Sequence, residues 1–302
     1  MRVLISGLPL FSKRLAEDLQ EFDPTSSYRF LDTYNSKLAQ LKFLLLLPLA
    51  DCVISMNGVT DNSGSLNWVV KLKKKLIMQW MGTDVMIALE RFKEGTIDRK
   101  YIDYAKHLVD ATWLKDELKE SGVSAQLIDF KYTFPGEPLH KYENNAVMSY
   151  VAQARQEFYG IEMIHQAANR FPEINFLLYG MKDTKYVFPK NVKLMGWTTE
   201  TEFAEGLKST SVFLRLPKHD GFSASVIEAM GFGCEVFWTF PGPNAIVVNN
   251  SEELIDKLAT TFQAIEARDF RPNLTSREFV LENFNKEQVI KNYIKTLKEI
   301  VG

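Results

Sequence analysis

Cysteine and histidine are scarce in this sequence, which has two cysteines and four histidines among its 302 residues. Cys52 and Cys234 lie far apart, each inside or beside an apolar run, and they show no spacing typical of metal ligands. The histidines form no metal-like cluster along the chain either. We therefore expect two reduced, buried thiols and no metal site formed by these cysteines and histidines.

Long apolar runs are also missing. The longest, from Phe43 to Ala50, is interrupted by Pro48, whereas a membrane-spanning helix needs about 20 apolar residues. The apolar stretch that precedes Gly7 is too short for the hydrophobic region of a signal peptide. We expect a cytoplasmic protein with no membrane-spanning segment.

Two segments bear on peripheral contact with a membrane. Lys71 to Lys75 contains four lysines, which could touch an anionic membrane or complement the dipole of a helix end, and we favour the helix end. We interpret the leucine-rich segment Leu38 to Leu47 as a buried helix rather than an interfacial anchor. Peripheral membrane association stays an open alternative.

A charge excess of one sign is the third absence. The net charge of −2 provides no basic field to gather a nucleic acid backbone, so we expect no nucleic acid partner. Hydrophobic residues make up 46% and charged residues 25%, the balance of an ordinary globular protein. A chain of 302 residues exceeds what one core usually organises, which favours two domains.

Short apolar runs alternate with helical patterns along nearly the whole chain, which predicts α/β domains with parallel sheets. In the first half we predict strands near Val3–Ser6, Tyr28–Leu31, Cys52–Met56, Leu76–Gln79, Leu108–Ala111 and Ala125–Ile128. In the second half we predict them near Ala146–Val151, Ile174–Tyr179, Val192–Met195, Val212–Leu216, Glu235–Trp238 and Ile246–Val248. The fold class is therefore two Rossmann-like, doubly wound domains that face each other across a cleft.

The proline-rich segment Thr133 to Pro138 and the polar residues after it suggest the domain boundary. We expect domains at 1–140 and 141–275. Residues 276–302 read as two helices, broken near Asn283 to Asn285, that pack across the two lobes.

Ligands bind outside the carboxyl ends of the strands in doubly wound sheets. The loop after Val212–Leu216 passes through Asp220 and Gly221 and becomes helical, with Ser223 as the expected N-cap. The free N–H groups and dipole of a helix N-terminus can hold a diphosphate. Glu228, about one turn into the helix, can accept hydrogen bonds from both hydroxyls of a ribose.

Asp220 and Glu228, separated by seven residues and followed by Ala229-Met230-Gly231-Phe232-Gly233, resemble the E-x7-E signature of family 4 glycosyltransferases, which have the GT-B fold. Asn191 to Trp197 resembles the segment against which these enzymes seat the nucleotide base. Tyr179-Gly180 with Lys182 resembles their strand-to-glycine turn. Gln79 to Asp84 is similar to their N-lobe H-G-T/S-D segment, and Ser6-Gly7 matches the end of their first strand.

The chain departs from the family pattern at three positions. Asp220 replaces the usual Glu, Met81 replaces His, and Phe158-Tyr159-Gly160 replaces Lys-Gly, which removes a phosphate-binding lysine. Arg155, Lys182, Arg215 or Lys218 could supply the missing positive charge, and we favour Arg155 and Lys182.

The resemblance implies a glycosyltransferase that moves a sugar from a nucleoside diphosphate sugar to a glycan or lipid-linked acceptor in surface polysaccharide synthesis. It also implies anomeric retention and no required metal, and we expect no cofactor. We expect Asp220 to be catalytic. We expect the donor to be bound by Gly7, Arg155, Gly180, Lys182, Trp197, Gly221, Phe222, Ser223 and Glu228.

Two residues carry alternatives of their own. Asp84 is either a helix-capping residue or a contact to the acceptor or the other lobe. His219 is a contact to the acceptor or the other lobe, a catalytic acid or base, or a solvated loop histidine. For the whole protein, the alternatives are a non-catalytic nucleotide-sugar-binding protein and an epimerase or phosphorylase on the same fold.

Overall fold

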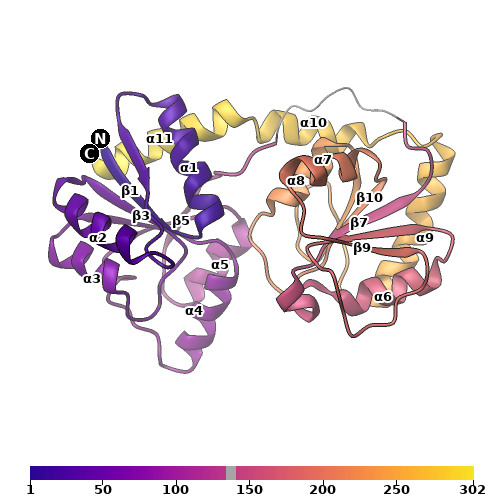
Figure 1. Cartoon of the computed structure of the whole chain (residues 1–302), viewed down its shortest axis with the longest axis horizontal. Coiled ribbons are helices and arrows are strands. Elements are labelled where there is room, and N and C mark those ends of the chain that lie inside the picture. Colours follow the sequence, from indigo (N-terminus) through magenta and orange to yellow (C-terminus); the bar gives the residue numbers. More distant parts are fainter. Residues whose placement is uncertain (134–140) are drawn as a thin grey trace. The chain divides into compact units, whose positions relative to one another are not determined.

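The chain forms two α/β units, which the computed structural model describes for residues 1–133 and 141–302 (Figure 1). The first unit comprises Met1–Lys131 together with Lys286–Gly302, and the second comprises Tyr132–Asn285. Each unit builds a six-stranded sheet whose neighbouring strands are parallel. The predicted class, two doubly wound α/β domains, is confirmed.

In the first unit the strand order is β2-β1-β3-β4-β5-β6. The strands are β1 (Arg2–Gly7), β2 (Ser27–Phe30), β3 (Cys52–Met56), β4 (Lys75–Gln79), β5 (Lys106–Val109) and β6 (Ala125–Leu127). The helices are α1 (Pro9–Phe22), α2 (Lys37–Leu46), η1 (Leu47–Leu49), α3 (Gly64–Lys71), α4 (Thr83–Lys93), α5 (Thr112–Glu120) and α11 (Lys286–Val301). The strand order reverses between β1 and β3, where doubly wound sheets leave room for a ligand.

In the second unit the strand order is β12-β11-β10-β7-β8-β9. The strands are β7 (Ala146–Tyr150), β8 (Asn175–Tyr179), β9 (Val192–Gly196), β10 (Val212–Arg215), β11 (Glu235–Trp238) and β12 (Ile246–Val247). The helices are η2 (Gln153–Tyr159), α6 (Ile161–Arg170), α7 (Glu200–Lys208), α8 (Ala224–Gly231), α9 (Ser251–Ala267) and α10 (Leu274–Asn283). Here the order reverses between β7 and β10, as in the six-stranded dinucleotide-binding fold.

Every strand predicted from the sequence is present, and only β5 is displaced appreciably. We predicted it at Leu108–Ala111, but it begins at Lys106. The polar His107 sits inside the strand because its Nδ1 accepts a hydrogen bond from Trp80 Nε1 (3.1 Å) and its Nε2 bonds to the carbonyl of Ile102 (2.9 Å). A buried histidine with both ring nitrogens bonded carries no apolar signal in the sequence.

The strands are apolar because helices cover both faces of a parallel sheet. All residues of β3 and β10 are buried. The core of the second unit joins strand residues such as Phe176 and Leu214 to helix residues such as Ile164 and Leu258. Full burial of such a side chain contributes about 1.5–3 kcal/mol.

Local signals at helix ends are also confirmed. Helix α5 ends before Gly122, whose φ is +73°, and α8 ends before Gly233, whose φ is +70°. Glycine adopts this left-handed conformation without a steric penalty. Trp80 and Trp238, expected in the core, are completely buried.

The chain leaves the first unit after Lys131 and returns to it at Lys286. Helix α10 packs against α8 in the second unit, whereas α11 packs against α1 in the first, where Lys286 pairs with Asp18 (2.9 Å). The predicted helix break coincides with the end of α10. The predicted boundary at residue 140 lies outside the described residues, and packing of residues 276–302 across the lobes stays a prediction.

The interpretation of Leu38–Leu47 as a buried helix is wrong. Within α2 only Phe43 is buried, while Leu38, Leu41 and Leu45 are 62%, 55% and 67% exposed. These three leucines follow the i, i+3, i+7 spacing of one helix face, and Phe43 lies on the other. Apolar residues occur on both faces of this helix, so its sequence does not show which face is buried.

The two thiols are buried and unpaired, as expected. Burial raises the pKa of both Cys52 and Cys234 to about 12, which keeps them protonated. Over residues 1–133 and 141–302, no helix is long and apolar enough to cross a membrane.

Candidate functional site

The residues predicted to bind a ligand lie mostly in the second unit, at the carboxyl ends of four neighbouring strands. Tyr150 ends β7, Gly180 follows β8, Gly196 ends β9 and Arg215 ends β10. Because the strands are parallel, these ends share one edge of the sheet. The edge includes the reversal between β7 and β10, where this architecture binds ligands.

Arg215 and Asp220 form a buried ion pair at this reversal. Arg215 Nε donates to Asp220 Oδ2 over 2.7 Å, and the two side chains are 10% and 14% exposed. Burial disfavours the charged guanidinium, but the Asp220 carboxylate and Tyr159 outweigh it and raise the pKa of Arg215. Asp220, the predicted catalytic residue, is therefore oriented by Arg215, which we had considered only as a phosphate ligand.

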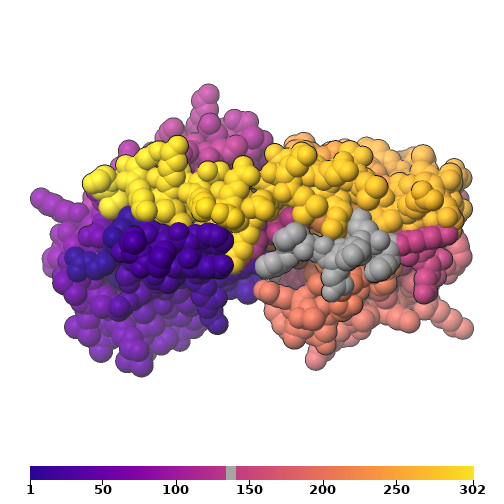
Figure 2. Space-filling model, turned by 90° about the horizontal axis from the view of Figure 1, so that it is seen from above, coloured from indigo at the N-terminus to yellow at the C-terminus, as the bar shows by residue number. Residues whose placement is uncertain are grey.

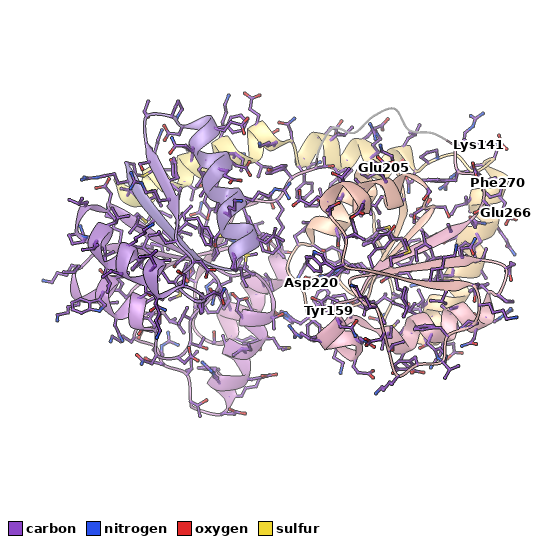
Figure 3. All side chains as sticks on the ribbon, viewed as in Figure 1. Lys141, Tyr159, Glu205, Asp220, Glu266 and Phe270 are labelled. Carbon is purple, nitrogen blue, oxygen red and sulfur yellow. The ribbon has the colours of Figure 1, made fainter. Side chains whose placement is uncertain are left out.

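Tyr159 ends η2, and Gly160 lies between η2 and α6 and packs against Leu216, the residue after β10. The Arg215 guanidinium lies 5.0 Å from the centre of the Tyr159 ring, and Figure 3 shows Tyr159 and Asp220 on the same side of the second unit. Gly160 has a φ of +72°, and a Cβ there would lie 2.6 Å from the carbonyl oxygen of Leu216. Only glycine allows this approach, which places the start of α6 beside the ion pair.

Arg155, favoured as a phosphate ligand, is exposed in η2. Its guanidinium lies 4.0 Å from the centre of the Phe158 ring. Its φ of −138° breaks the helical run. Its role in binding phosphate stays a prediction. Arg215 offers a positive group beside the loop before α8, because it pairs with Asp220.

Gly180, Lys182 and Trp197 line the β8–β9 side of the edge. Gly180 has a φ of +87°, and a Cβ there would lie 2.7 Å from the carbonyl oxygen of Val151. The alkyl chain of Lys182 packs against Gly196. Trp197 is 74% exposed and meets Tyr150 edge to face at 6.5 Å. A tryptophan exposed to this extent can offer its ring to a planar ligand.

Ser223 is the N-cap residue of α8, as predicted, but its side chain makes no capping hydrogen bond. Its Oγ lies 2.9 Å from Ser225 Oγ instead. Capping hydroxyls normally satisfy the free N–H groups of a first helical turn. Glu228 is partly exposed within the same helix. This geometry suits an anion at the helix start.

Gly221 and Phe222 shape the loop before α8. The Phe222 ring packs against Trp238 (5.4 Å between centroids) and Phe284 (5.0 Å). The ring therefore anchors the loop in the core, and only the backbone here is suited to a ligand. The donor-binding role of both residues stays a prediction.

The reading of His219 as a solvated loop histidine is wrong. Its side chain is 8% exposed and meets Phe240 edge to face at 5.7 Å. The aromatic contact draws the loop inward, a long-range effect that its polar neighbours in sequence do not signal. A role as acid or base stays a prediction.

Two predicted residues belong to the first unit. Gly7 ends β1 at the strand reversal, with a φ of +111° and room for no Cβ beside Met56 N. The Asp84 carboxylate accepts backbone N–H bonds from Gly58 (2.6 Å), Met81 (3.0 Å), Gly82 (2.8 Å) and Val85 (3.0 Å). Burial raises the pKa of Asp84, and these N–H groups oppose the shift.

Asp84 therefore holds the start of α4 against the loop after β3. This geometry matches the capping alternative. A contact with an acceptor or the other lobe stays a prediction.

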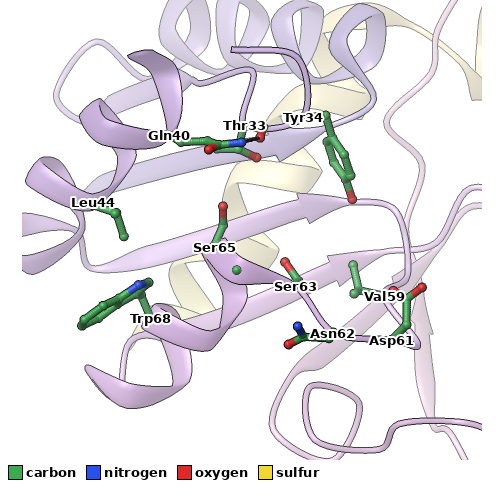
Figure 4. A pocket seen from close by; sticks show the side chains of 11 residues that line it. Thr33, Tyr34, Gln40, Leu44, Val59, Asp61, Asn62, Ser63, Ser65 and Trp68 are labelled. Atoms are coloured by element: carbon green, nitrogen blue, oxygen red, sulfur yellow. Dashed lines mark hydrogen bonds between the residues drawn. The ribbon is translucent and has the colours of Figure 1, made fainter. Parts of the chain in front are cut away.

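A pocket in the first unit was not anticipated. It has a volume of about 460 Å³ and lies between the loops after β2 and β3 and helices α2 and α3 (Figure 4). Its walls combine polar groups, among them Tyr34, Gln40 and Asn62, with the apolar Leu44 and Trp68. Such a mixture suits a ligand with hydroxyl groups and an apolar part.

Sequence reasoning also missed Tyr150 and Tyr159. A signal existed for Tyr150, because it is the next-to-last residue of the strand predicted at Ala146–Val151 and so lies near the ligand edge. Tyr159 stands in the segment that departs from the family pattern. The departure predicts the loss of a lysine there but does not predict a role for the tyrosine. Among the described residues, no group of three or more His, Cys, Asp or Glu side chains could hold a metal.

No family model matches the chain, and no curated protein matches its sequence. Solved structures do match. Anabaena Alr3699/HepE in complex with UDP and glucose is 12% identical over 99% of both chains, with a TM-score of 0.72. Sucrose-phosphate synthase from Thermosynechococcus elongatus is 13% identical over 99% of both chains, with a TM-score of 0.71.

UDP-GlcNAc 2-epimerase from Neisseria meningitidis bound to UDP-GlcNAc is 12% identical over 99% of this chain and 100% of its own, with a TM-score of 0.56. At these identities the likeness concerns the fold, which is GT-B. Membership of family 4 in particular stays a prediction.

Proposed function

We propose that this protein is a glycosyltransferase that moves a sugar from a nucleoside diphosphate sugar to an acceptor. The observation that carries the proposal is the buried Arg215–Asp220 pair at the β7–β10 reversal, beside the start of α8. The glycosyltransferase structures that share the fold support it, and UDP in the HepE complex makes UDP the first nucleotide to test.

The donor is held by the second unit in this proposal. The start of α8 and the positive groups Arg215 and Arg155 face the diphosphate, and Glu228 accepts hydrogen bonds from the ribose. Trp197 stacks on the base. Asp220, fixed by Arg215, accepts hydrogen bonds from hydroxyls of the donor sugar.

In the transfer itself, the bond from the anomeric carbon to the β-phosphate oxygen breaks. The acceptor oxygen bonds to that carbon, and its proton passes to the released diphosphate. Positive groups and N–H dipoles already in place stabilise the growing charge of the leaving group, usually a large term in catalysis.

The acceptor is held by the first unit, in the pocket between α2 and α3. Its polar and apolar walls suit a glycan or lipid-linked acceptor. The proposal also includes anomeric retention, independence of metals and cofactors, a cytoplasmic location and a role in polysaccharide synthesis. These parts rest on the resemblance to family 4.

The test is thermal unfolding with UDP, GDP, ADP, CDP and dTDP in parallel. A ligand that binds only the folded state at 100 times its Kd stabilises it by about 2.7 kcal/mol. We expect UDP to raise the Tm most. No response to any nucleotide would overturn the proposal.

Glu228→Ala sharpens the test. Loss of charge-assisted hydrogen bonds of about 1.5–3 kcal/mol each should weaken UDP binding at least about tenfold. Glu205→Ala is the matched control, because Glu205 is an exposed acid on α7 that pairs with Lys208. Equal UDP affinity in both folded variants would remove Glu228 from the site.

A second candidate is a nucleotide-sugar epimerase, favoured by the likeness to the Neisseria enzyme. The two activities separate on incubation with a UDP-sugar and no acceptor. A glycosyltransferase slowly releases free UDP as water replaces the acceptor, whereas an epimerase alters the sugar while it stays attached to UDP. Bound donor with neither outcome favours a non-catalytic binding protein.

A further inference from the structure

The first unit exposes a row of leucines on α2 and η1. Leu38, Leu41 and Leu45 of α2 and Leu49 of η1 are 62%, 55%, 67% and 55% exposed. We name these four residues the leucine face. Surface leucines are ordinary when single, but four on one face within 12 residues form a patch that marks an interaction site.

The neighbouring helix extends the same apolar surface. Helices α2 and α3 lie next to each other (Figure 1), and α3 adds Trp68, 42% exposed, while Leu72 just after it is 41% exposed. Figure 4 shows Leu44 of α2 and Trp68 of α3 on the same side of the pocket. The apolar surface therefore continues to the wall of the proposed acceptor pocket.

The charged residues within α2, η1 and α3 and just after α3 are all lysines, and the acids Asp51 and Asp61 adjoin these segments. Residues 36–50 contain Lys37 and Lys42 and no Asp or Glu, and residues 62–82 contain Lys71, Lys73, Lys74 and Lys75 and no Asp or Glu. The chain as a whole has a net charge of −2, so this excess is local. Lys37, Lys42, Lys71 and Lys73 are exposed.

Two lysines have structural tasks instead. Lys75 Nζ donates to the carbonyl oxygens of Ile300 (3.2 Å) and Val301. Lys74 Nζ donates to the carbonyl oxygens of Pro48 (2.7 Å) and Ala50 (2.9 Å). These bonds tie the end of α3 to η1. The two hydrogen bonds therefore fix the segment that carries Leu72 against the segment that carries Leu49.

We propose that the leucine face, with Trp68, Leu72 and the four exposed lysines, docks onto an anionic lipid bilayer. Leucines enter the boundary between headgroups and acyl chains, and lysine stems lie along apolar surface while their ammonium groups reach lipid phosphates. A second copy of the chain fits this surface less well. A two-fold dimer would place the same lysines against each other, and lysine is depleted at protein interfaces.

Docking also gives the pocket a substrate class, a step that rests on the proposed function. Leu44 and Trp68 belong both to the wall of the pocket and to the apolar surface, so an acceptor anchored in the bilayer would lie within reach of the pocket with its hydroxyl headgroup.

The test is co-sedimentation of the full chain with vesicles of phosphatidylcholine alone or of equal parts phosphatidylcholine and phosphatidylglycerol. We expect binding to the anionic vesicles. The binding should be weaker in 0.5 M salt, because screening reduces the range of the attraction between lysines and lipid phosphates. Equal binding to both vesicle types, or none to either, would overturn the proposal. Concentration-dependent dimers in light scattering that vanish in the leucine variant below would also overturn it, in favour of a second copy.

Two variants separate the apolar and electrostatic parts. The triple variant Leu38→Asn/Leu41→Asn/Leu45→Asn should reduce the vesicle partition coefficient by about tenfold or more. The variant Lys37→Gln/Lys42→Gln/Lys71→Gln/Lys73→Gln should reduce it about fivefold per lysine.

The matched control is Val187→Asn/Leu274→Asn in the second unit, whose residues are 88% and 58% exposed. It should bind vesicles like the unaltered chain. An equal loss in control and leucine variant would contradict the assigned surface. UDP binding should be unchanged in all three variants, so failure of docking and failure of the proposed function are distinguishable.

Discussion

The two units share an architecture but differ in what they place at the reversal of strand order. In the second unit the reversal lies between β7 and β10, and a buried Arg215–Asp220 pair stands beside it. In the first unit it lies between β1 and β3, and Gly7 there packs directly against the backbone of Met56. The reversal in the second unit carries a charged pair, whereas the one in the first unit has a glycine at the end of β1, where a Cβ would meet the Met56 backbone.

The buried acids differ in the same way. Both carboxylate oxygens of Asp84 in the first unit accept hydrogen bonds from backbone N–H groups, whereas Asp220 Oδ2 in the second unit accepts a hydrogen bond from the Arg215 guanidinium. A carboxylate that accepts several N–H bonds is committed to structure. One that is paired with an arginine at the reversal of strand order lies where this architecture binds ligands. Burial alone therefore does not distinguish a structural acid from a functional one.

The largest expected effect comes from breaking the ion pair of the second unit. Asp220→Asn leaves Arg215 as an uncompensated buried charge and should destabilise this unit by about 3–5 kcal/mol. Urea unfolding followed by tryptophan fluorescence measures the loss, with separate transitions for the two units.

The matched control in the first unit is Asp61→Asn. Asp61 pairs with Arg91 over 3.0 Å but is 64% exposed, so its removal should cost less than about 1 kcal/mol. The double variant Arg215→Met/Asp220→Leu should regain most of the stability while remaining inactive in transfer. An active double variant would contradict the catalytic role of Asp220.

A smaller effect concerns the two exposed tryptophans, one in each unit. Trp197→Ala should weaken UDP binding by about 1–3 kcal/mol, the usual range for a base stacked on an aromatic ring. Its stability should hardly change, because the ring is 74% exposed. Titration calorimetry gives the affinity.

Trp68→Ala is the counterpart in the first unit, where the ring is 42% exposed beside the pocket. We expect UDP affinity to be retained and vesicle binding to fall. If the Trp68 variant loses UDP affinity instead, the assignment of donor and lipid surfaces to different units fails.

The comparison also shows which features the sequence could predict. Parallel strands buried on both faces leave apolar runs of a few residues, so all twelve predicted strands are present. Helix-end glycines such as Gly122 and Gly233 were equally readable, because their conformation depends on neighbouring residues alone. The segment from Asp220 to Glu228 was found because strand, loop and helix follow one another directly.

Features that depend on distant partners could not be predicted. Tyr150 and Trp197 meet only because β7, β8 and β9 are adjacent in the sheet. His219 is buried by Phe240, from a different loop. The exposure of the α2 leucines depends on what the rest of the unit leaves uncovered, which the sequence of the helix does not reveal.

The smallest expected effect concerns two acids of the first unit, Asp110 and Asp129, which follow β5 and β6. Burial raises the pKa of Asp129 to about 6, with a further contribution from Asp110 that Lys131 partly offsets. Because this pKa lies above its unfolded value, the protonated side chain favours folding below about pH 4, and this contribution is lost as the pH rises through 6. Asp129→Asn removes the ionisation and should stabilise the first unit at pH 8 by about 1–2 kcal/mol.

The gain should shrink towards zero between pH 6 and pH 4, as measured by the Tm of the first unit. Asp116→Asn on the exposed side of α5 changes the net charge equally and should show no such pH dependence. A constant gain for Asp129→Asn at every pH would mean that packing, rather than ionisation, limits this position.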